Sequence, residues 1–100
     1  MKSVIRYKTT PEAADENQRL VEEVYRELAA KKPARLQYAT FRLEDGVSFM
    51  HVALIEPDGP SPLAAIAAFS EFLRDLPGRC VEPPVAVSAT VVGSFRFFAS

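Results

Sequence analysis

His51 is the residue of this chain whose type is best suited to acid–base chemistry, and it lies in the apolar run SFMHVALIE, residues 48–56. A histidine can accept a proton near neutral pH because its surroundings readily tune its pKa. The alternative is a buried histidine that is hydrogen-bonded across the sheet or across a subunit interface. Both interpretations stay open, because buried polar groups mark function in only some proteins.

Other motifs that carry chemistry are missing. One histidine and one cysteine cannot supply the usual ligand set of a zinc site, and the four dispersed glycines form no phosphate-binding loop. No serine lies in a G-x-S-x-G context. Cys80 has no intrachain partner and no helix N-terminus of its own, so we expect a thiol without a role. Adjacent acidic residues are typical of solvated helix positions and a turn. The sequence thus predicts neither a metal nor a cofactor.

Composition indicates an ordinary single domain over residues 1–100. The chain is 48% hydrophobic and 25% charged, with a net charge of −1. That balance argues against nucleic acid as a partner, and the strands lack the aromatic and basic pattern of RNA-binding sheets. The N-terminus has no long apolar region typical of a signal peptide, and the run PLAAIAAF is too short to span a membrane. We therefore expect a cytoplasmic protein with no membrane partner.

The first half of the chain predicts a strand followed by a helix. SVIRYKT, residues 3–9, alternates and is rich in β-branched and aromatic residues. Thr10 can cap a helix that has Pro11 at its first position, and acidic residues early with Lys31 and Lys32 at the end suit the helix dipole. Its predicted apolar stripe comprises Leu20, Val21, Val24, Tyr25 and Leu28.

The second half predicts a hairpin, a helix and a strand. Residues 35–56 alternate on both sides of Asp45-Gly46, a strong turn signal. Ser61 can cap a second helix that ends before Pro77-Gly78, and whose first two turns lack charge and are therefore expected to be buried nearly all round. PPVAVSATVVGSFRFF, residues 83–98, predicts a long strand with Gly93 at a bulge or bend.

The element order is therefore β-α-β-β-α-β. This is the split βαβ arrangement of the ferredoxin-like α+β fold, with one four-stranded antiparallel sheet and both helices on one face. Both faces of the third and fourth predicted strands are largely apolar, although two helices cover only one face. An uncovered apolar face is a solubility liability, and a second copy stacked sheet on sheet would cover it. We expect a homodimer formed through the sheet face.

These features together resemble the antibiotic biosynthesis monooxygenase (ABM) superfamily of dimeric α+β barrels. The resemblance covers residues 3–97 and includes RLEDGVSFMHVAL, residues 42–54, and VVGSFRFF, residues 91–98. It implies the fold and the dimer, and it suggests cofactor-independent oxygenation of a quinol-like or anthrone-like molecule. The superfamily's haem-degrading pattern requires a tryptophan, an asparagine in the cleft and a histidine on the second helix. This chain has no tryptophan, Asn17 is in the first helix and His51 is on a strand, so haem degradation is excluded.

The strand register at Asp45-Gly46 decides what surrounds His51. A two-residue turn pairs Arg42 with Phe49, Thr40 with His51 and Tyr38 with Ala53. It would place Tyr38, Thr40, Arg42 and His51 on the side facing the partner subunit, and leave Ala39, Phe41, Met50, Val52 and Leu54 for the helices. A three-residue loop with a bulge shifts the pairing by one, which would isolate His51 and let it project into a helix-covered pocket.

The catalytic hypothesis assigns His51 as general base toward a phenolic substrate, whose anion then reacts with dioxygen. Arg42 or Arg6 could stabilise that anion, and Tyr7, Tyr25 or Tyr38 could orient the ring. The sequence-derived substrate site thus comprises Tyr7, Tyr38 and Arg42. Tyr25, Phe69 and Phe72 have the helical spacing of core residues, and Phe95, Phe97 and Phe98 are expected to pack against another subunit. The alternative function is a non-catalytic ligand-binding or structural homodimer.

Overall fold

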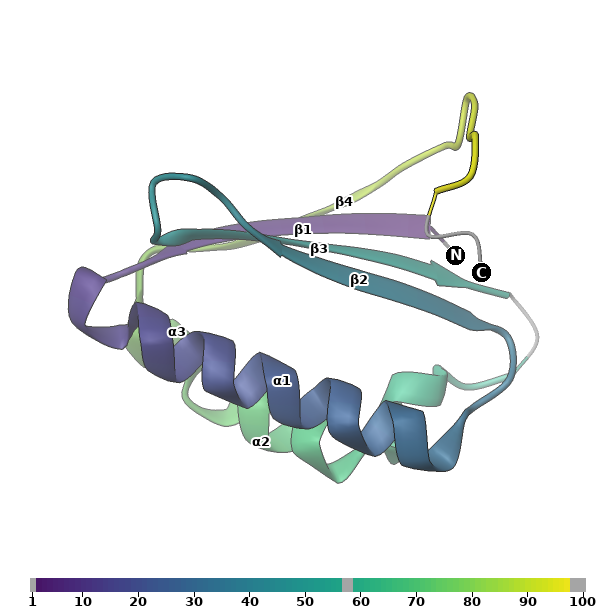
Figure 1. Ribbon diagram of the computed structural model, residues 1–100, viewed down its shortest axis with the longest axis horizontal. Helices are drawn as coiled ribbons and strands as arrows, with labels where there is room; N and C mark the ends of the chain where they lie inside the picture. Colours follow the sequence, from purple (N-terminus) through teal and green to yellow (C-terminus); the bar gives the residue numbers. More distant parts are fainter. Residues whose placement is uncertain (1, 57–58, 98–100) are drawn as a thin grey trace.

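The computed structural model describes residues 2–56 and 59–97, which form a four-stranded antiparallel sheet with its helices on one face (Figure 1). The order of strands across the sheet is β2-β3-β1-β4, and the order along the chain is the predicted β-α-β-β-α-β. Both confirm the ferredoxin-like arrangement. The strands and α-helices are β1 (Lys2–Thr9), α1 (Ala14–Lys31), β2 (Leu36–Arg42), β3 (Ser48–Ile55), α2 (Ala67–Arg74), α3 (Leu76–Arg79) and β4 (Cys80–Ser88).

The start of the first helical segment is as predicted. The Thr10 side chain accepts a hydrogen bond from the amide of Ala13, and a 3-10 turn, η1 (Pro11–Ala13), leads into α1. Helix α1 ends at Lys31, because Lys32 adopts a left-handed conformation with φ 47°. The dipole at that end favours the positive charge that Lys31 supplies. Together these signals fix the position of α1 along the chain.

The second helical region differs from the single helix that the sequence predicts. Ser61 caps a 3-10 turn, η2 (Pro62–Ala65), as expected, but Ile66 is extended and α2 begins only at Ala67. The break is stabilised from α1, where the Glu27 carboxylate accepts hydrogen bonds from the amides of Ala67 and Ala68. Residues 64, 65 and 67 are exposed, so the expectation that the first two turns are buried all round was wrong.

The end of this region also differs from the prediction. Pro77 and Gly78 do not follow the helix but lie inside the short helix α3, which ends at Arg79. Proline fits the first turn of a helix because its missing N–H would have no intrahelical partner there. As a consequence the Arg79 side chain is carried under the sheet, where it is buried.

The last strand is shorter than predicted. β4 spans Cys80–Ser88, and residues 89–97 form no strand, so Gly93 lies outside the sheet and the predicted strand over residues 83–98 was wrong in its second half. The reason is the length of the partner strand. β1 begins at Lys2, whose carbonyl accepts the last hydrogen bond from Ala89. Within residues 2–56 and 59–97 no strand pairs with the chain after Ala89, which rises on the side of the sheet away from the helices (Figure 1). Phe98 is outside the described residues.

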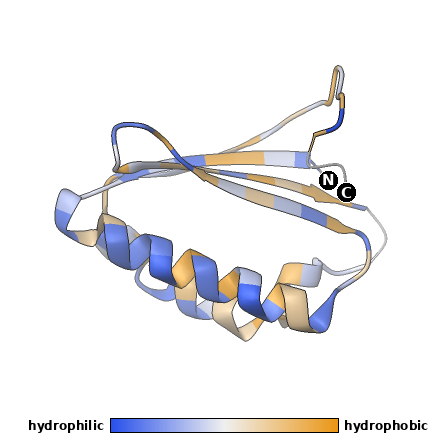
Figure 2. Cartoon of the chain, viewed as in Figure 1, coloured by the Kyte–Doolittle hydropathy of each residue, from blue (hydrophilic) through white to orange (hydrophobic). Residues whose placement is uncertain are grey.

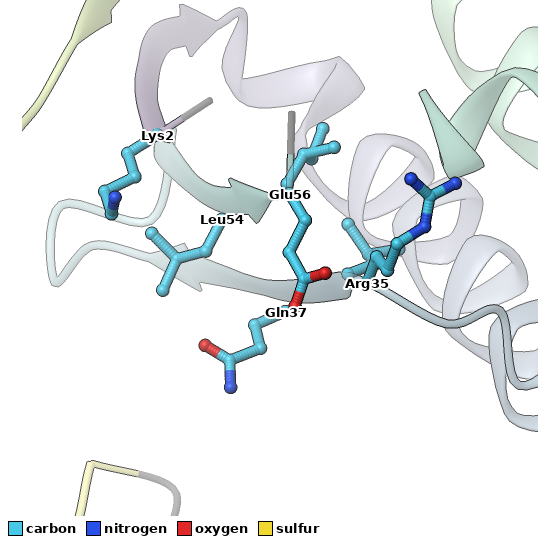
Figure 3. Close-up of a pocket in the computed structure, with 7 residues that line it drawn as sticks. Lys2, Arg35, Gln37, Leu54 and Glu56 are labelled. Carbon is cyan, nitrogen blue, oxygen red and sulfur yellow. The ribbon is translucent and has the colours of Figure 1, made fainter. Parts of the chain in front are cut away.

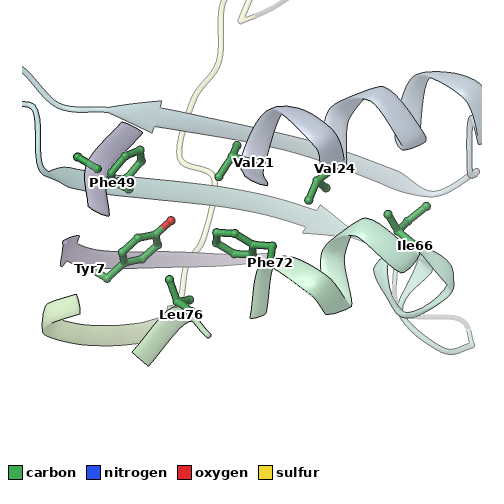
Figure 4. Close-up of a cluster of buried hydrophobic side chains, with 8 residues drawn as sticks. Tyr7, Val21, Val24, Phe49, Ile66, Phe72 and Leu76 are labelled. Atoms are coloured by element: carbon green, nitrogen blue, oxygen red, sulfur yellow. The ribbon is translucent and has the colours of Figure 1, made fainter. Parts of the chain in front are cut away.

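The core lies between the helices and the sheet (Figure 4). Phe49 of β3 stacks on Tyr7 of β1, with 5.6 Å between ring centroids, and Phe72 of α2 packs against both Tyr7 and His51. Burying these rings supplies much of the stabilising free energy of a domain of this size. The buried members of the cluster are Tyr7, Ala14, Val21, Val24, Phe49, Ile66, Phe72 and Leu76.

The opposite face of the sheet, which we call the outer face, is covered by no helix within residues 2–56 and 59–97. Alternation along the strands places Val4, Met50 and Val52 there, and β4 adds Val85 and Val87, which are 60% and 54% exposed. Arg6 is also exposed on this face. Figure 2 shows hydrophobic segments along these strands, in contrast to the hydrophilic stretches of α1. In the described residues, no helix has both the length and the apolar character needed to cross a membrane.

Candidate functional site

The hairpin that carries His51 has the register of the first alternative. Arg42 pairs with Phe49, Thr40 with His51 and Tyr38 with Ala53. The loop itself is longer than a two-residue turn, because the Gly46 amide donates to the Leu43 carbonyl. The Asp45 carboxylate accepts hydrogen bonds from Val47, Ser48 and the Ser48 hydroxyl, and these bonds lower its pKa to about 2. The Asp45 side chain and the positive φ of Gly46, +79°, together fix the strand register of the hairpin.

The face of the sheet assigned to His51 on that register was wrong. His51, Tyr38 and Thr40 point toward the helices, whereas Met50 and Val52 lie on the outer face. Register determines which residues share a face, but it does not determine which of the two faces the helices cover. Because both faces of β3 are apolar, its hydrophobic pattern carried no signal to decide between them. His51 therefore combines the register of one alternative with the helix-covered position of the other.

Both ring nitrogens of His51 are hydrogen-bonded, and the residue is only 2% exposed. Its Nε2 lies 2.8 Å from the Tyr7 hydroxyl. Its Nδ1 lies 2.6 Å from the Tyr38 hydroxyl and 3.0 Å from Thr40 Oγ1. Thr40 Oγ1 in turn lies 2.8 Å from the hydroxyl of Tyr25 on α1. Three tyrosines from three elements thus converge on one imidazole.

The network extends from Tyr7 to two residues that the sequence analysis did not single out. Asn17 Nδ2, on α1, donates to the Tyr7 hydroxyl at 2.8 Å, and Arg79 Nε donates to Asn17 Oδ1 at 3.0 Å. Arg79 also donates to the carbonyl of Phe72 at 2.7 Å, and its guanidinium lies over the Phe72 ring. A signal for Asn17 was present, since it lies four residues before Val21 on the buried stripe of α1. Nothing in the sequence pattern marked Arg79.

Burial controls the ionisation of this network. Desolvation lowers the pKa of His51 to about 4, so the imidazole is neutral near pH 7. Burial also raises the pKa of the Tyr7 and Tyr38 hydroxyls well above the ordinary value, partly offset by hydrogen bonds from Asn17 and Thr40. In the described part of the chain, every buried side-chain polar atom has a hydrogen-bond partner. The site is a neutral and fully hydrogen-bonded array.

Two hollows flank Tyr25 at the edge of the sheet, between α1 and β2. One, of about 330 Å³, has Tyr25, Leu28, Lys32, Pro33 and Tyr38 in its lining. We call it the α1–β2 hollow. The other, of about 270 Å³, is lined by Tyr25, Thr40 and Arg42 among others. Tyr25 stacks on Tyr38, with 5.5 Å between ring centroids, and separates the two. His51 lines neither hollow, but its Nδ1 partners, Tyr38 and Thr40, do.

Two further hollows lie at the other side of β2 and β3. The larger, of about 400 Å³, is at the end of the β2–β3 pair, where Lys2, Arg35 and Glu56 surround Leu54 (Figure 3), and none of the His51 network lines it. The other, of about 200 Å³, has Tyr38, Ala39, Val52 and Phe97 in its lining, so the segment after β4 reaches back to the sheet there. Tyr38 is the only residue of the His51 network in the lining of this second hollow. No cluster of metal-ligating side chains occurs within residues 2–56 and 59–97.

The structure brings together two of the three predicted substrate-binding residues with the predicted catalytic one. Tyr7 and Tyr38 contact His51 directly. Arg42 does not, because its guanidinium bonds Asp15, Gln18 and the Gly46 carbonyl and lies over the Phe49 ring. It nevertheless lines the smaller hollow beside Tyr25. Arg6, the other suggested anion-stabilising residue, is on the outer face, away from this network.

Comparison with solved structures identifies the fold. One match is the crystal structure of an antibiotic biosynthesis monooxygenase. The match covers 92% of this chain and 98% of the chain in that structure, with a TM-score of 0.65 at 18% identity. The match to the Mycobacterium tuberculosis protein Rv0793 covers 93% of this chain and 95% of Rv0793, with a TM-score of 0.70 at 9% identity. The match to a candidate antibiotic biosynthesis monooxygenase from Caulobacter crescentus CB15 covers 90% of this chain and 89% of that protein's chain, with a TM-score of 0.61 at 17% identity.

These matches confirm the fold that the resemblance implied. At such low identities they establish the fold and leave the reaction to the residues of the site. No protein-family model matches the sequence, and no curated protein matches it either.

Proposed function

We propose that this chain is a cofactor-independent monooxygenase that acts on a quinol-like or other aromatic small molecule. One observation carries the proposal: a neutral imidazole is held between the hydroxyls of Tyr7 and Tyr38, and Tyr38 lines a hollow at the edge of the sheet. Two of the matched structures bear the description of antibiotic biosynthesis monooxygenases, which supports the same class of reaction. The substrate would lie between α1 and β2, with its ring against Tyr25 and its oxygen toward the network.

The proposed reaction draws its electrons from the substrate. The anion of an anthrone-like molecule, or of a quinol that reacts through its keto tautomer, reacts with dioxygen, so that a ring CH2 of the keto form becomes a carbonyl. The O–O bond breaks, one oxygen atom enters the new C=O group, and the other leaves as water with the two hydrogens of the CH2. The task of the protein is to hold the substrate and to stabilise its oxyanion with oriented hydrogen bonds. His51 and its tyrosine partners supply those bonds in this proposal.

The proposal includes a homodimer formed through the outer face. Within residues 2–56 and 59–97 no helix covers the apolar side chains of β1, β3 and β4 on that face, and Val85 and Val87 stay more than half exposed. A second copy related by a twofold axis would bury them against an identical surface. Phe97, which lines a hollow on this face, would lie at the margin of the interface.

A second function, a non-catalytic ligand-binding or structural dimer, is favoured by one specific observation. His51 is almost fully buried and both of its ring nitrogens are already hydrogen-bonded. A satisfied buried histidine stabilises a fold without taking part in a reaction. This candidate differs from the first in requiring no turnover.

Oxygen consumption separates the two functions. With a panel of quinols and anthrones, wild type should consume dioxygen and His51→Asn should lose about 100-fold or more of that rate, because the variant no longer orients the Tyr38 hydroxyl that donates to the reacting oxygen. Arg74→Gln, an exposed change on α2 away from the network, is the matched control and should retain the wild-type rate. If the folded wild type consumes no oxygen with any member of the panel, the non-catalytic function is favoured.

A further inference from the structure

Arg79 is an unusual group to find at the base of this network. Its side chain is buried, and in the part of the chain that the structure describes it makes no ion pair with a carboxylate. Its contacts are Asn17, the Phe72 carbonyl and the Phe72 ring. Because a guanidinium can only donate hydrogen bonds and stays charged, it imposes a direction on whatever it contacts.

Arg79 first fixes the orientation of the Asn17 side-chain amide. Arg79 Nε must donate, so the Asn17 atom that faces it is the carbonyl oxygen, and the amide nitrogen faces Tyr7. An asparagine side chain cannot exchange these two atoms without placing its NH2 group against the guanidinium. The Tyr7 hydroxyl oxygen therefore accepts from Asn17.

The Tyr7 hydroxyl proton then determines the state of His51. In the described residues, the only other polar atom bonded to the Tyr7 oxygen is His51 Nε2, at 2.8 Å. If Nε2 carried a proton, the Tyr7 oxygen would accept twice and its own buried proton would have no acceptor. The satisfied arrangement has Tyr7 donating to a bare Nε2. A neutral imidazole carries one proton, which is then on Nδ1.

We propose that Arg79, acting through Asn17 and Tyr7, holds His51 as the Nδ1-protonated tautomer, and that the network consequently presents hydrogen-bond donors to an oxyanion or carbonyl oxygen of a ligand in the α1–β2 hollow. Nδ1–H donates to the Tyr38 oxygen at 2.6 Å, which leaves the Tyr38 proton for a ligand. Thr40, the second neighbour of Nδ1, links to the Tyr25 hydroxyl. Arg79 and His51 are thus positioning residues, Tyr38 is the donor toward the ligand, and His51 does not act as a base.

The α1–β2 hollow has a positively charged residue in its lining, which suits an anionic ligand. Lys32 is its only charged lining residue, and the remaining lining is aromatic and aliphatic. Aligned hydrogen bonds polarise one another, so the buried cation at one end favours negative charge at the other. The geometry therefore selects an aromatic ligand with a phenolate or enolate oxygen. This choice of ligand rests on the proposed function for its location, whereas the tautomer does not.

The tautomer is directly measurable because the chain has one histidine. In protein labelled with 15N-histidine, a protonated ring nitrogen resonates far upfield of a bare one, and couplings to the ring protons distinguish Nδ1 from Nε2. Wild type should show a protonated Nδ1 and a bare Nε2 at pH 7. A protonated Nε2 in folded wild type would overturn the proposal and return His51 to the role of a base, with no effect on whether oxygen is consumed.

Asn17→Asp should reverse this tautomer while it keeps the packing. The carboxylate still accepts from Arg79 but cannot donate, so Tyr7 donates to it and accepts from His51 Nε2–H. We expect the two 15N signals to exchange their positions. Gln18→Glu, the same change of charge one residue along α1, should leave the wild-type tautomer in place. An unchanged tautomer in folded Asn17→Asp would show that Arg79 and Asn17 do not set it.

Binding of 4-nitrophenol, which ionises near neutral pH with a change in absorbance, tests the ligand class. Wild type should bind the phenolate more tightly than the phenol, and Asn17→Asp should lose about ten-fold of that preference, the scale of one charge-assisted hydrogen bond. Equal binding of the two forms by wild type, or no binding of either, would overturn the ligand assignment while the NMR result stands by itself. Oxygen consumption with a quinol is a separate measurement, so failure of the proposed reaction is distinguishable from both.

Discussion

The two faces of this sheet differ in how far their side chains are buried within one chain. The helix-covered face is closed: Phe49 is 1% exposed, and each buried side-chain polar atom of the described residues has a hydrogen-bond partner. On the outer face the side chains are mostly apolar, and Val85 and Val87 of β4 remain more than half exposed. The closed face carries the residues of the His51 network, although both faces have many apolar side chains.

The contrast shows where a polar network can be maintained in a small domain. Buried polar groups are costly unless each is hydrogen-bonded, so they belong where one chain can supply every partner. The His51 network draws on β1, α1, β2, β3 and α3 for that purpose. Apolar surface needs only complementary shape, and a second copy of the same surface can provide it. The inner face is therefore closed by residues of one chain, and in the proposed dimer a second chain would close the outer face.

The largest expected effect concerns the outer face. Val87→Asp should weaken dimerisation by at least about 100-fold, or roughly 3 kcal/mol, because the twofold axis buries two unpaired carboxylates in the proposed interface. Light scattering at micromolar concentration should then report a dimer for wild type and a monomer for the variant. Since Val87 is already 54% exposed in the monomer, its replacement should have little effect on the fold itself.

Ala64→Asp provides the control for that comparison. Residue 64 is exposed on η2, on the other side of the molecule from the outer face, and the same charge there should leave the dimer unchanged. A wild-type mass equal to that of one chain would contradict the proposed dimer, and the outer face would then have to be accepted as exposed.

A comparable effect is expected on the inner face when the pH falls. The pKa of His51 is about 4 in the folded state against 6.5 for the ordinary group. Between these values the unfolded chain takes up a proton that the folded chain does not, so the stability contributed by the neutral buried imidazole is lost as the pH falls through this window. The loss integrates to roughly 3 kcal/mol at full extent. Urea unfolding at a series of pH values from 7 to 4 measures it.

His51→Gln isolates this contribution from that of the carboxylates. The hydrogen bonds to Asp45 and Glu27 hold their pKa values below the ordinary range, so their contributions disappear only toward the acid end of the window. Tyr7 and Tyr38 face the imidazole, and the Arg79 guanidinium reaches it through Asn17. Burial raises the pKa of both tyrosine hydroxyls, so neither loses a proton between pH 7 and 5. Stability should therefore fall between pH 7 and 5 in wild type and stay nearly level in His51→Gln. Parallel curves for the two proteins would contradict a depressed pKa at His51.

The sequence predicted the fold well where local signals agreed with each other. Thr10, Pro11 and the dipole-matched charges located α1, and Asp45-Gly46 located the hairpin. It failed where an element depends on a distant partner. The break at Ile66 is capped by Glu27 of α1, and the pairing of β4 with β1 ends with the hydrogen bond from Ala89 to the Lys2 carbonyl. Neither dependence is present in the local pattern of residues 61–76 or 83–98.

The site was predictable only in part, because some of its residues meet through local strand pairing and others through contacts between distant elements. Cross-strand register brought Thr40 and Tyr38 to His51, as one alternative stated, because pairing follows from the hairpin alone. Tyr7 and Asn17 required the placement of β1 and α1 against that hairpin. Arg79 required the short helix α3, which begins where the sequence predicted a helix to end. The face itself was undetermined, because both sets of alternate residues on β3 are apolar.

The turn at Gly46 tests how strongly that register is fixed, with the smallest expected effect. Gly46 has φ +79°, so Gly46→Ala should destabilise the fold by about 1 kcal/mol through backbone strain, although nothing lies within 4 Å of the added Cβ. Gly78→Ala is the matched control, because its site is equally open and has no positive φ, and its stability in urea should equal or exceed that of wild type. If the two substitutions had equal effects, strain at the turn would not help to fix the register, and cross-strand packing on the inner face alone would hold Thr40 opposite His51.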